Sequence, residues 1–148
     1  MMATPEADFA ARVRDGLRPH GVDTERIENR VNLGVSDMLV GAGDRFAAVE
    51  LKVVQRGLKV ALRPHQTAFL ARHAAAGRPC FVLVLHKGSL LRASRVLLFT
   101  GSQAVELAAN GLKTEPVRAW NSRGMDWSEL AALLSGKAPI AGLAQPEQ

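Results

Sequence analysis

The chain lacks the residues that build several common kinds of site. Only one of its 148 residues is cysteine, which excludes an internal disulfide and a cysteine-rich zinc site. None of its four histidines forms a pair with zinc-ligand spacing and an acidic third ligand. The sequence contains no Walker-type phosphate loop, no Ser/His/Asp arrangement and no internal repeat. Zinc, nucleotide and catalytic-triad chemistry are therefore not expected.

Long apolar runs are also lacking. The longest, Cys80 to Leu85, has the length of a strand, whereas a membrane span requires about 20 residues. Residues 1–10 contain early acids and no apolar segment, so we expect no secretory signal and a cytoplasmic protein. Cys80, at the head of the run, is expected to be a small buried hydrophobic side chain.

The charge balance favours a polyanionic partner. The chain has 19 Lys and Arg against 14 Asp and Glu, a formal net charge of +5, and basic surface attracts phosphate groups at long range. Many modestly basic proteins bind nothing charged, so charge alone does not decide for nucleic acid.

The length predicts one domain, which we place at residues 1–135. Residues 136–148 are rich in Gly, Pro, Ala and Gln, which predicts a disordered tail.

Capping residues and apolar periodicity predict an α/β order of elements. Thr4 and Pro5 should start a first helix that ends near Gly21, and residues 24–31 are either a helix end or a first strand. Later elements are expected as a helix over 64–76, a buried strand over 80–85, a strand over 94–100, a short helix over 102–109 and a last helix from Asp126 to Leu134.

The most informative stretch runs from Ser36 to Lys52. It predicts a short strand ending near Asp37, a Gly-rich hairpin at residues 41–44, and a longer strand. Because side chains alternate along a strand, Glu50 and Lys52 share one face, about 7 Å apart, inside an otherwise apolar run. An unpaired charge there is costly, and pairing of the two strands brings Asp37 toward Glu50. Two carboxylates converge beside a lysine.

This constellation suits metal-assisted chemistry on a phosphate. Mg²⁺ prefers oxygen ligands and keeps several waters, so two carboxylates are enough to hold it. The lysine can orient or deprotonate an attacking water, or stabilise charge on a phosphate in the transition state.

Asp37, then Glu50-x-Lys52, then a helix bearing Gln66 resembles the PD-(D/E)xK nuclease superfamily, most of all its small phage-type and Holliday-junction-resolvase-like members. The resemblance covers about residues 25–87 and implies a restriction-endonuclease-like core, a mixed central β-sheet flanked by helices. It also implies a Mg²⁺- or Mn²⁺-dependent DNA endonuclease of phage or mobile-element DNA processing or junction resolution. Ser36 stands where the motif usually has proline, a backbone-shaping residue without catalytic chemistry.

The resemblance also implies roles for single residues. Asp37 and Glu50 become metal ligands, Lys52 the catalytic lysine and Gln66 an auxiliary polar residue. Glu28 matches an upstream acidic ligand, although an isolated glutamate is equally well a surface residue. Gln66 could instead only cap its helix at the third position.

Three basic residues of the loop after the central strand, Arg56, Lys59 and Arg63, are expected to contact DNA phosphates.

A homodimer is expected if two strands are to be cut, since one site cuts one strand. The apolar segment 96–99 and the two tryptophans either supply its interface or complete the monomer's core. The alternatives to a nuclease are an inactive nucleic-acid-binding module and an assembly protein of a mobile element.

Overall fold

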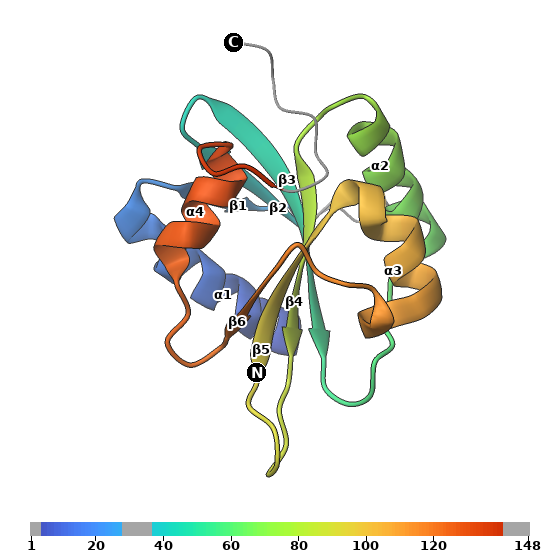
Figure 1. Cartoon of the computed structure of the whole chain (residues 1–148). Helices are drawn as coiled ribbons and strands as arrows, with labels where there is room; N and C mark the ends of the chain where they lie inside the picture. The colour runs from blue at the N-terminus through green and yellow to red at the C-terminus, as the bar shows by residue number, and fades with distance from the viewer. Residues whose placement is uncertain (1–3, 28–36, 141–148) are drawn as a thin grey trace.

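A single mixed β-sheet organises the chain, in a computed structural model that describes residues 4–27 and 37–140 (Figure 1). The six strands lie in sequence order across the sheet, β1-β2-β3-β4-β5-β6. Every neighbouring pair is antiparallel except β3 and β4, which are parallel. Helices α1 and α4 cover one face and helices α2 and α3 the other. The predicted mixed α/β sheet is thus confirmed.

The helices and strands have the following bounds. The strands are β1 Asp23–Arg26, β2 Met38–Ala42, β3 Arg45–Val54, β4 Cys80–His86, β5 Arg95–Thr100 and β6 Arg118–Asn121. The α-helices are α1 Pro5–Leu17, α2 Pro64–Ala75, α3 Ala104–Asn110 and α4 Trp127–Ser135. Short 3₁₀ turns occupy Arg18–His20, Gly101–Gln103 and Gly111–Lys113. Among these described helices, none combines the length and the apolar character needed to cross a bilayer.

The first helix begins as predicted but ends earlier. The Thr4 hydroxyl accepts a hydrogen bond from the backbone N–H of Ala7 at 3.1 Å, and Pro5 follows as the first helical residue. The α-helix stops at Leu17 instead of near Gly21, and a 3₁₀ turn follows. Pro19 lies in that turn, and proline cannot donate the backbone hydrogen bond that a longer α-helix needs there.

The β2–β3 hairpin differs from its expected boundaries. Strand β2 starts directly after Asp37 instead of ending near it, and continues through Ala42. The turn is therefore only Gly43-Asp44, with φ of +64° at Gly43. Two-residue hairpin turns need a positive φ at a central position, which glycine adopts without steric cost. The tight turn sets the register, in which Met38 pairs with Val49.

Helix α2 is the crossover between the parallel strands β3 and β4, as the run from Cys80 to Leu85 predicts. All seven residues of β4 are buried, because the strand is central and covered on both faces. Cys80 is a buried free thiol, and its burial raises its pKa to about 11. It is accordingly a packing residue, as expected.

The segments that could have formed a dimer interface complete the monomer. Residues 96–99 are at most 3% exposed, and Trp120 and Trp127 pack against the core under α1 and α4. Trp120 belongs to β6, an edge strand that the sequence patterns did not predict. The packed chain also runs past residue 135 to Ile140, which is buried in the same core. Residues 141–148, the rest of the predicted tail, lie outside the described residues.

Candidate active site

Strand β3 carries two different side-chain sets on its two faces. Val49 and Leu51 point into the apolar core beneath α1 and α4. Glu50 and Lys52 alternate with them and face α2, on the side where Ala48 and Val54 pack with α2 and α3. The Glu50 side chain is 1% exposed and that of Lys52 is 15% exposed. The carboxylate is thus inside the protein, while the lysine lies at the boundary with solvent.

Asp37 reaches this site from the neighbouring strand. The β2–β3 register pairs Met38 with Val49, so one step further along the ladder Asp37 lies opposite Glu50. The Asp37 carboxylate accepts a hydrogen bond from the backbone N–H of Leu51, with 3.1 Å between Oδ2 and N. This main-chain donor holds Asp37 beside Glu50, a contact that no side-chain pattern in the sequence could reveal.

Gln66 ties the helix to both charged residues of β3. Its side-chain Nε2 donates to Glu50 Oε1 at 2.7 Å, and its Oε1 accepts from Lys52 Nζ at 3.1 Å. The same Oε1 accepts from the backbone N–H of Arg63 at 3.0 Å, the capping contact at the start of α2. The two interpretations of Gln66, helix cap and site residue, therefore describe one side chain that makes both sets of contacts.

The electrostatics of the site centre on Glu50. Burial raises its pKa from the ordinary 4.5 to about 8, and the negative charge of Asp37 acts in the same direction. Lys52 opposes the rise, since its Nζ lies 3.6 Å from Glu50 Oε1. A carboxyl group with such a pKa holds its proton at neutral pH, so a cation that binds Glu50 must displace this proton and should bind more tightly as the pH rises.

The oxygens fit a hard divalent cation. Glu50 Oε1 is occupied by Gln66, but no donor from the described residues reaches the buried Glu50 Oε2, and the neighbouring Asp37 carboxylate can hydrogen-bond to Glu50 only while Glu50 holds a proton. A buried oxygen without a partner is costly unless something binds it, and oxygen donors are what Mg²⁺ takes. Within residues 4–27 and 37–140 no group of three or more His, Cys, Asp or Glu is close enough to hold a metal. Asp37 and Glu50 are a two-carboxylate set, and Glu28 lies outside the described residues.

The three predicted DNA contacts are exposed on the segment that connects β3 to α2. Arg63 immediately precedes α2 and is bonded to Gln66 through its backbone. Arg56 lies in the turn whose Gly57 carbonyl is 3.0 Å from His86 Nε2 at the end of β4. Lys59 follows Leu58, whose carbonyl accepts from the N–H of Leu112. Arg63 is thus next to the site, and the other two lie along the loop.

These three residues belong to a longer basic segment of the sequence. Residues 51–105 carry nine of the chain's 19 Lys and Arg and none of its 14 Asp and Glu. The basic residues of the segment beyond the site and its loop are Arg72, Arg78, Lys87, Arg92 and Arg95, all exposed. The absence of Asp and Glu between Glu50 and Glu106 would have been enough to identify this basic segment from the sequence. Motifs and periodicity do not reveal it.

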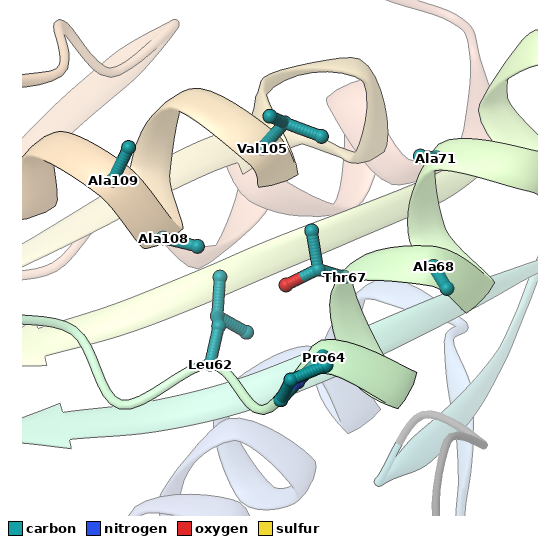
Figure 2. Close-up of a pocket in the computed structure, with 8 residues that line it drawn as sticks. All are labelled: Leu62, Pro64, Thr67, Ala68, Ala71, Val105, Ala108 and Ala109. Carbon is teal, nitrogen blue, oxygen red and sulfur yellow. The ribbon is translucent and has the colours of Figure 1, made fainter.

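A separate groove lies between α2 and α3 (Figure 2). It has a volume of about 510 Å³, and its lining is apolar apart from Thr67. The lining residues are Leu62, Pro64, Thr67, Ala68, Ala71, Val105, Ala108 and Ala109. None of these side chains titrates or binds metals well, so this groove offers no group for acid–base or metal chemistry.

Comparison with known proteins identifies the fold. No protein-family model matches the chain, and no curated protein matches it. Among solved structures, it is similar to Hjc, a Holliday junction resolvase from the archaeal hyperthermophile Archaeoglobus fulgidus, with a TM-score of 0.50. The two chains are 15% identical, and the match covers 84% of this chain and 98% of the resolvase. The chain therefore has the restriction-endonuclease-like α/β fold expected from its sequence.

Proposed function

We propose that this protein is a Mg²⁺- or Mn²⁺-dependent DNA endonuclease that hydrolyses phosphodiester bonds in branched DNA. The observation that carries the proposal is the pair of opposed carboxylates, Asp37 and Glu50, beside Lys52 and Gln66. Glu50 keeps one buried oxygen without a partner. The fold is shared with a Holliday junction resolvase, which supports a junction-like substrate.

Asp37 and Glu50 would hold the cation. When bound, it would polarise the phosphodiester and lower the pKa of a water molecule, the two contributions that divalent metals make to hydrolysis. Glu50 would bind in its ionised form, releasing the proton that its raised pKa retains at neutral pH. The Leu51 N–H would keep Asp37 in place, since it already donates to Oδ2.

Lys52 would act on the phosphate. With Glu50 ionised, the Lys52 ammonium group would lie 3.6 Å from a negative charge. A protonated lysine stabilises the charge that grows on the phosphate oxygens, and it can also orient the attacking water. Gln66 would hold this ammonium group in position through its bond to Nζ.

Arg56, Lys59 and Arg63 would bind DNA phosphates on either side of the cleaved bond. Their loop belongs to the acid-free basic segment, and phosphate contacts by exposed Lys and Arg supply most of the sequence-independent affinity for DNA.

A homodimer would deliver two cuts related by a two-fold axis. Segment 96–99 is buried in the monomer and would not contribute to its interface, whereas Trp120 and Trp127 are only partly buried. Sedimentation at micromolar concentration tests the dimer.

The decisive experiment is a cleavage assay on labelled linear, single-stranded, flapped and four-way DNAs, with and without Mg²⁺ or Mn²⁺. We expect metal-dependent cuts in branched DNA by the wild-type protein and none by Glu50→Gln. The matched control is Asp44→Asn, which removes an exposed carboxylate in the same hairpin. Binding of these DNAs without cleavage under any metal condition would instead indicate an inactive binding module.

A further inference from the structure

The β4–β5 hairpin presents two leucines entirely to solvent. It projects beyond the end of the sheet, and the loop after β3 leaves the sheet at the same end (Figure 1). At the tip, Leu90 is 104% exposed and Leu91 is 98% exposed. Large apolar side chains exposed side by side on a projecting element need a reason beyond folding, because they contribute no burial to the monomer.

Turn chemistry does not explain the two leucines. Ser89 and Arg92 close a two-residue turn through N–H to carbonyl bonds of 2.8 and 3.3 Å, and the Ser89 hydroxyl accepts from the N–H of Leu91 at 3.2 Å. Neither Leu90 nor Leu91 has a positive φ, and a turn of that kind accepts most residue types. The backbone therefore tolerates leucine at both positions but does not require it at either.

The neck of the hairpin is tightly packed. At Gly88 an added Cβ would lie 2.1 Å from the Arg92 carbonyl oxygen, so the two strands approach closely only because this residue is glycine. The Gly88 N–H donates to the Ser94 hydroxyl at 2.8 Å, and the Arg92 guanidinium donates to the Lys87 carbonyl at 3.0 Å. The tip is therefore held in place, which lowers the entropy lost when it binds a partner.

The hairpin's own exposed charged side chains are all cationic, and Asp8 of α1 lines a pocket with Lys87 at its base. Lys87, Arg92 and Arg95 are exposed on the hairpin. Arg56 is exposed on the loop after β3, next to Gly57, whose carbonyl contacts His86 at the end of β4. All these basic residues lie in the segment 51–105, which contains no acid. A partner that binds both the exposed leucines and the basic residues must be polyanionic and must offer an apolar cavity. Nucleic acid with an opened base step meets both requirements, since leucine is one of the side chains that enter such steps.

The hairpin and the carboxylate site can engage one DNA molecule. Lys52 pairs in the sheet with Val84, and the tip lies about six residues further along, which corresponds to about 20 Å at the rise of a strand. With about 3.4 Å per nucleotide step, this distance equals about six base pairs.

We propose that Leu90 and Leu91 form an apolar wedge that enters an opened base step of branched DNA, with Lys87, Arg92 and Arg95 on the flanking phosphates. This inference rests on the proposed function for its substrate, but it concerns binding and not hydrolysis. The wedge would select DNA that already has an unstacked step, because opening an intact duplex step costs a few kcal/mol. It would thereby give the enzyme its preference for branch points over linear duplex.

The test measures DNA binding and base unstacking in EDTA, where metal-dependent cleavage does not occur. Four-way and linear DNAs carry 2-aminopurine at or near the branch point. The double variant Leu90→Ser with Leu91→Ser should lose the fluorescence rise and about tenfold in affinity for four-way DNA, with linear-duplex affinity and salt dependence unchanged. Leu90→Met with Leu91→Met should keep both signals. The matched control is Val105→Ser, which removes an exposed apolar side chain on α3 that is 61% exposed.

An unchanged fluorescence rise in the double serine variant would overturn the wedge. So would a wild-type protein that cuts four-way DNA with Mg²⁺ yet produces no fluorescence rise, and in that case the proposed function survives. A serine variant that changes only the sedimentation coefficient would assign the tip to contact with a second copy and overturn the proposal as well. A wild-type protein that neither binds nor cuts any DNA would remove the proposed function and the wedge together.

Discussion

Leu51 and Glu50 are neighbours in β3, yet they lie in opposite environments. Leu51 is 1% exposed in the core beneath α1 and α4, among other apolar side chains. Glu50 is equally buried, but faces Asp37, Lys52 and Gln66 on the side of α2. One face of the strand stabilises the fold through apolar burial, and the other keeps a carboxyl group where its ionisation costs stability. The proposed metal site would account for this cost.

The sharpest way to test this contrast is to remove the polar side chains one at a time. We expect Asp37→Ala, Glu50→Ala and Lys52→Ala each to lower the rate of DNA cleavage by at least about 10³-fold, because each removes a metal ligand or the charge beside the phosphate. Calorimetry should show weaker metal binding in the two carboxylate variants and nearly unchanged binding in Lys52→Ala. Full activity in any of the three would contradict the assigned mechanism.

The pH dependence of stability is the next largest effect. The folded state holds a proton on Glu50 up to about pH 8, whereas the unfolded chain releases it near pH 4.5. The free energy of unfolding of the metal-free protein should therefore fall as pH rises through this window, by up to about 4 kcal/mol between pH 5 and pH 8. Glu50→Gln should lose this fall and be more stable than the wild type at pH 8. Denaturant titrations in EDTA measure it, with Asp44→Asn as the control that keeps the wild-type profile.

A substitution on the apolar face of β3 should lower stability and leave the cleavage rate nearly unchanged. Leu51→Ala should lower the free energy of unfolding by about 3 kcal/mol, since it opens a cavity in a packed core. Its backbone N–H remains, so the bond to Asp37 persists and cleavage below the melting temperature should stay within a few-fold of wild type. Thermal melts and cleavage rates well below the melting transition separate the two effects. A large loss of activity in a folded Leu51→Ala protein would show that the two faces are not independent.

The smallest effect concerns the basic loop. Neutralising Arg56, Lys59 or Arg63 singly should weaken binding to all DNAs alike and reduce the log–log salt slope by about one unit for each DNA phosphate that is no longer neutralised. Fluorescence anisotropy over a salt series gives the slope. Arg18→Ala is a suitable control, because Arg18 is exposed on the 3₁₀ turn after α1, away from the acid-free segment. An unchanged slope in all three loop variants would place the DNA elsewhere.

Some features of the site follow from local patterns alone. Alternation along β3 was enough to put Glu50 and Lys52 on one face, and the glycine-containing hairpin was enough to bring Asp37 toward them. Pro64 at the start of α2 and the buried run after Gly77 predicted the crossover that places Gln66 over the sheet. These inferences need only neighbouring residues, because period-two and period-3.6 patterns are local properties of the chain.

Other features depended on contacts between segments distant in sequence. The strand after Asp37, the end of α1 and the edge strand β6 were predicted wrongly or not at all, because pairing register and edge position are decided by tertiary packing. The amino-acid sequence by itself determined the α/β class, the alternation of Glu50 and Lys52 and the basic balance. Only the tertiary structure determined that Gln66 bonds both of them, that Glu50 keeps an oxygen without a partner and that Leu90 and Leu91 stand free. Each of these depends on where water is excluded, which is a property of the packed molecule and not of the local chain.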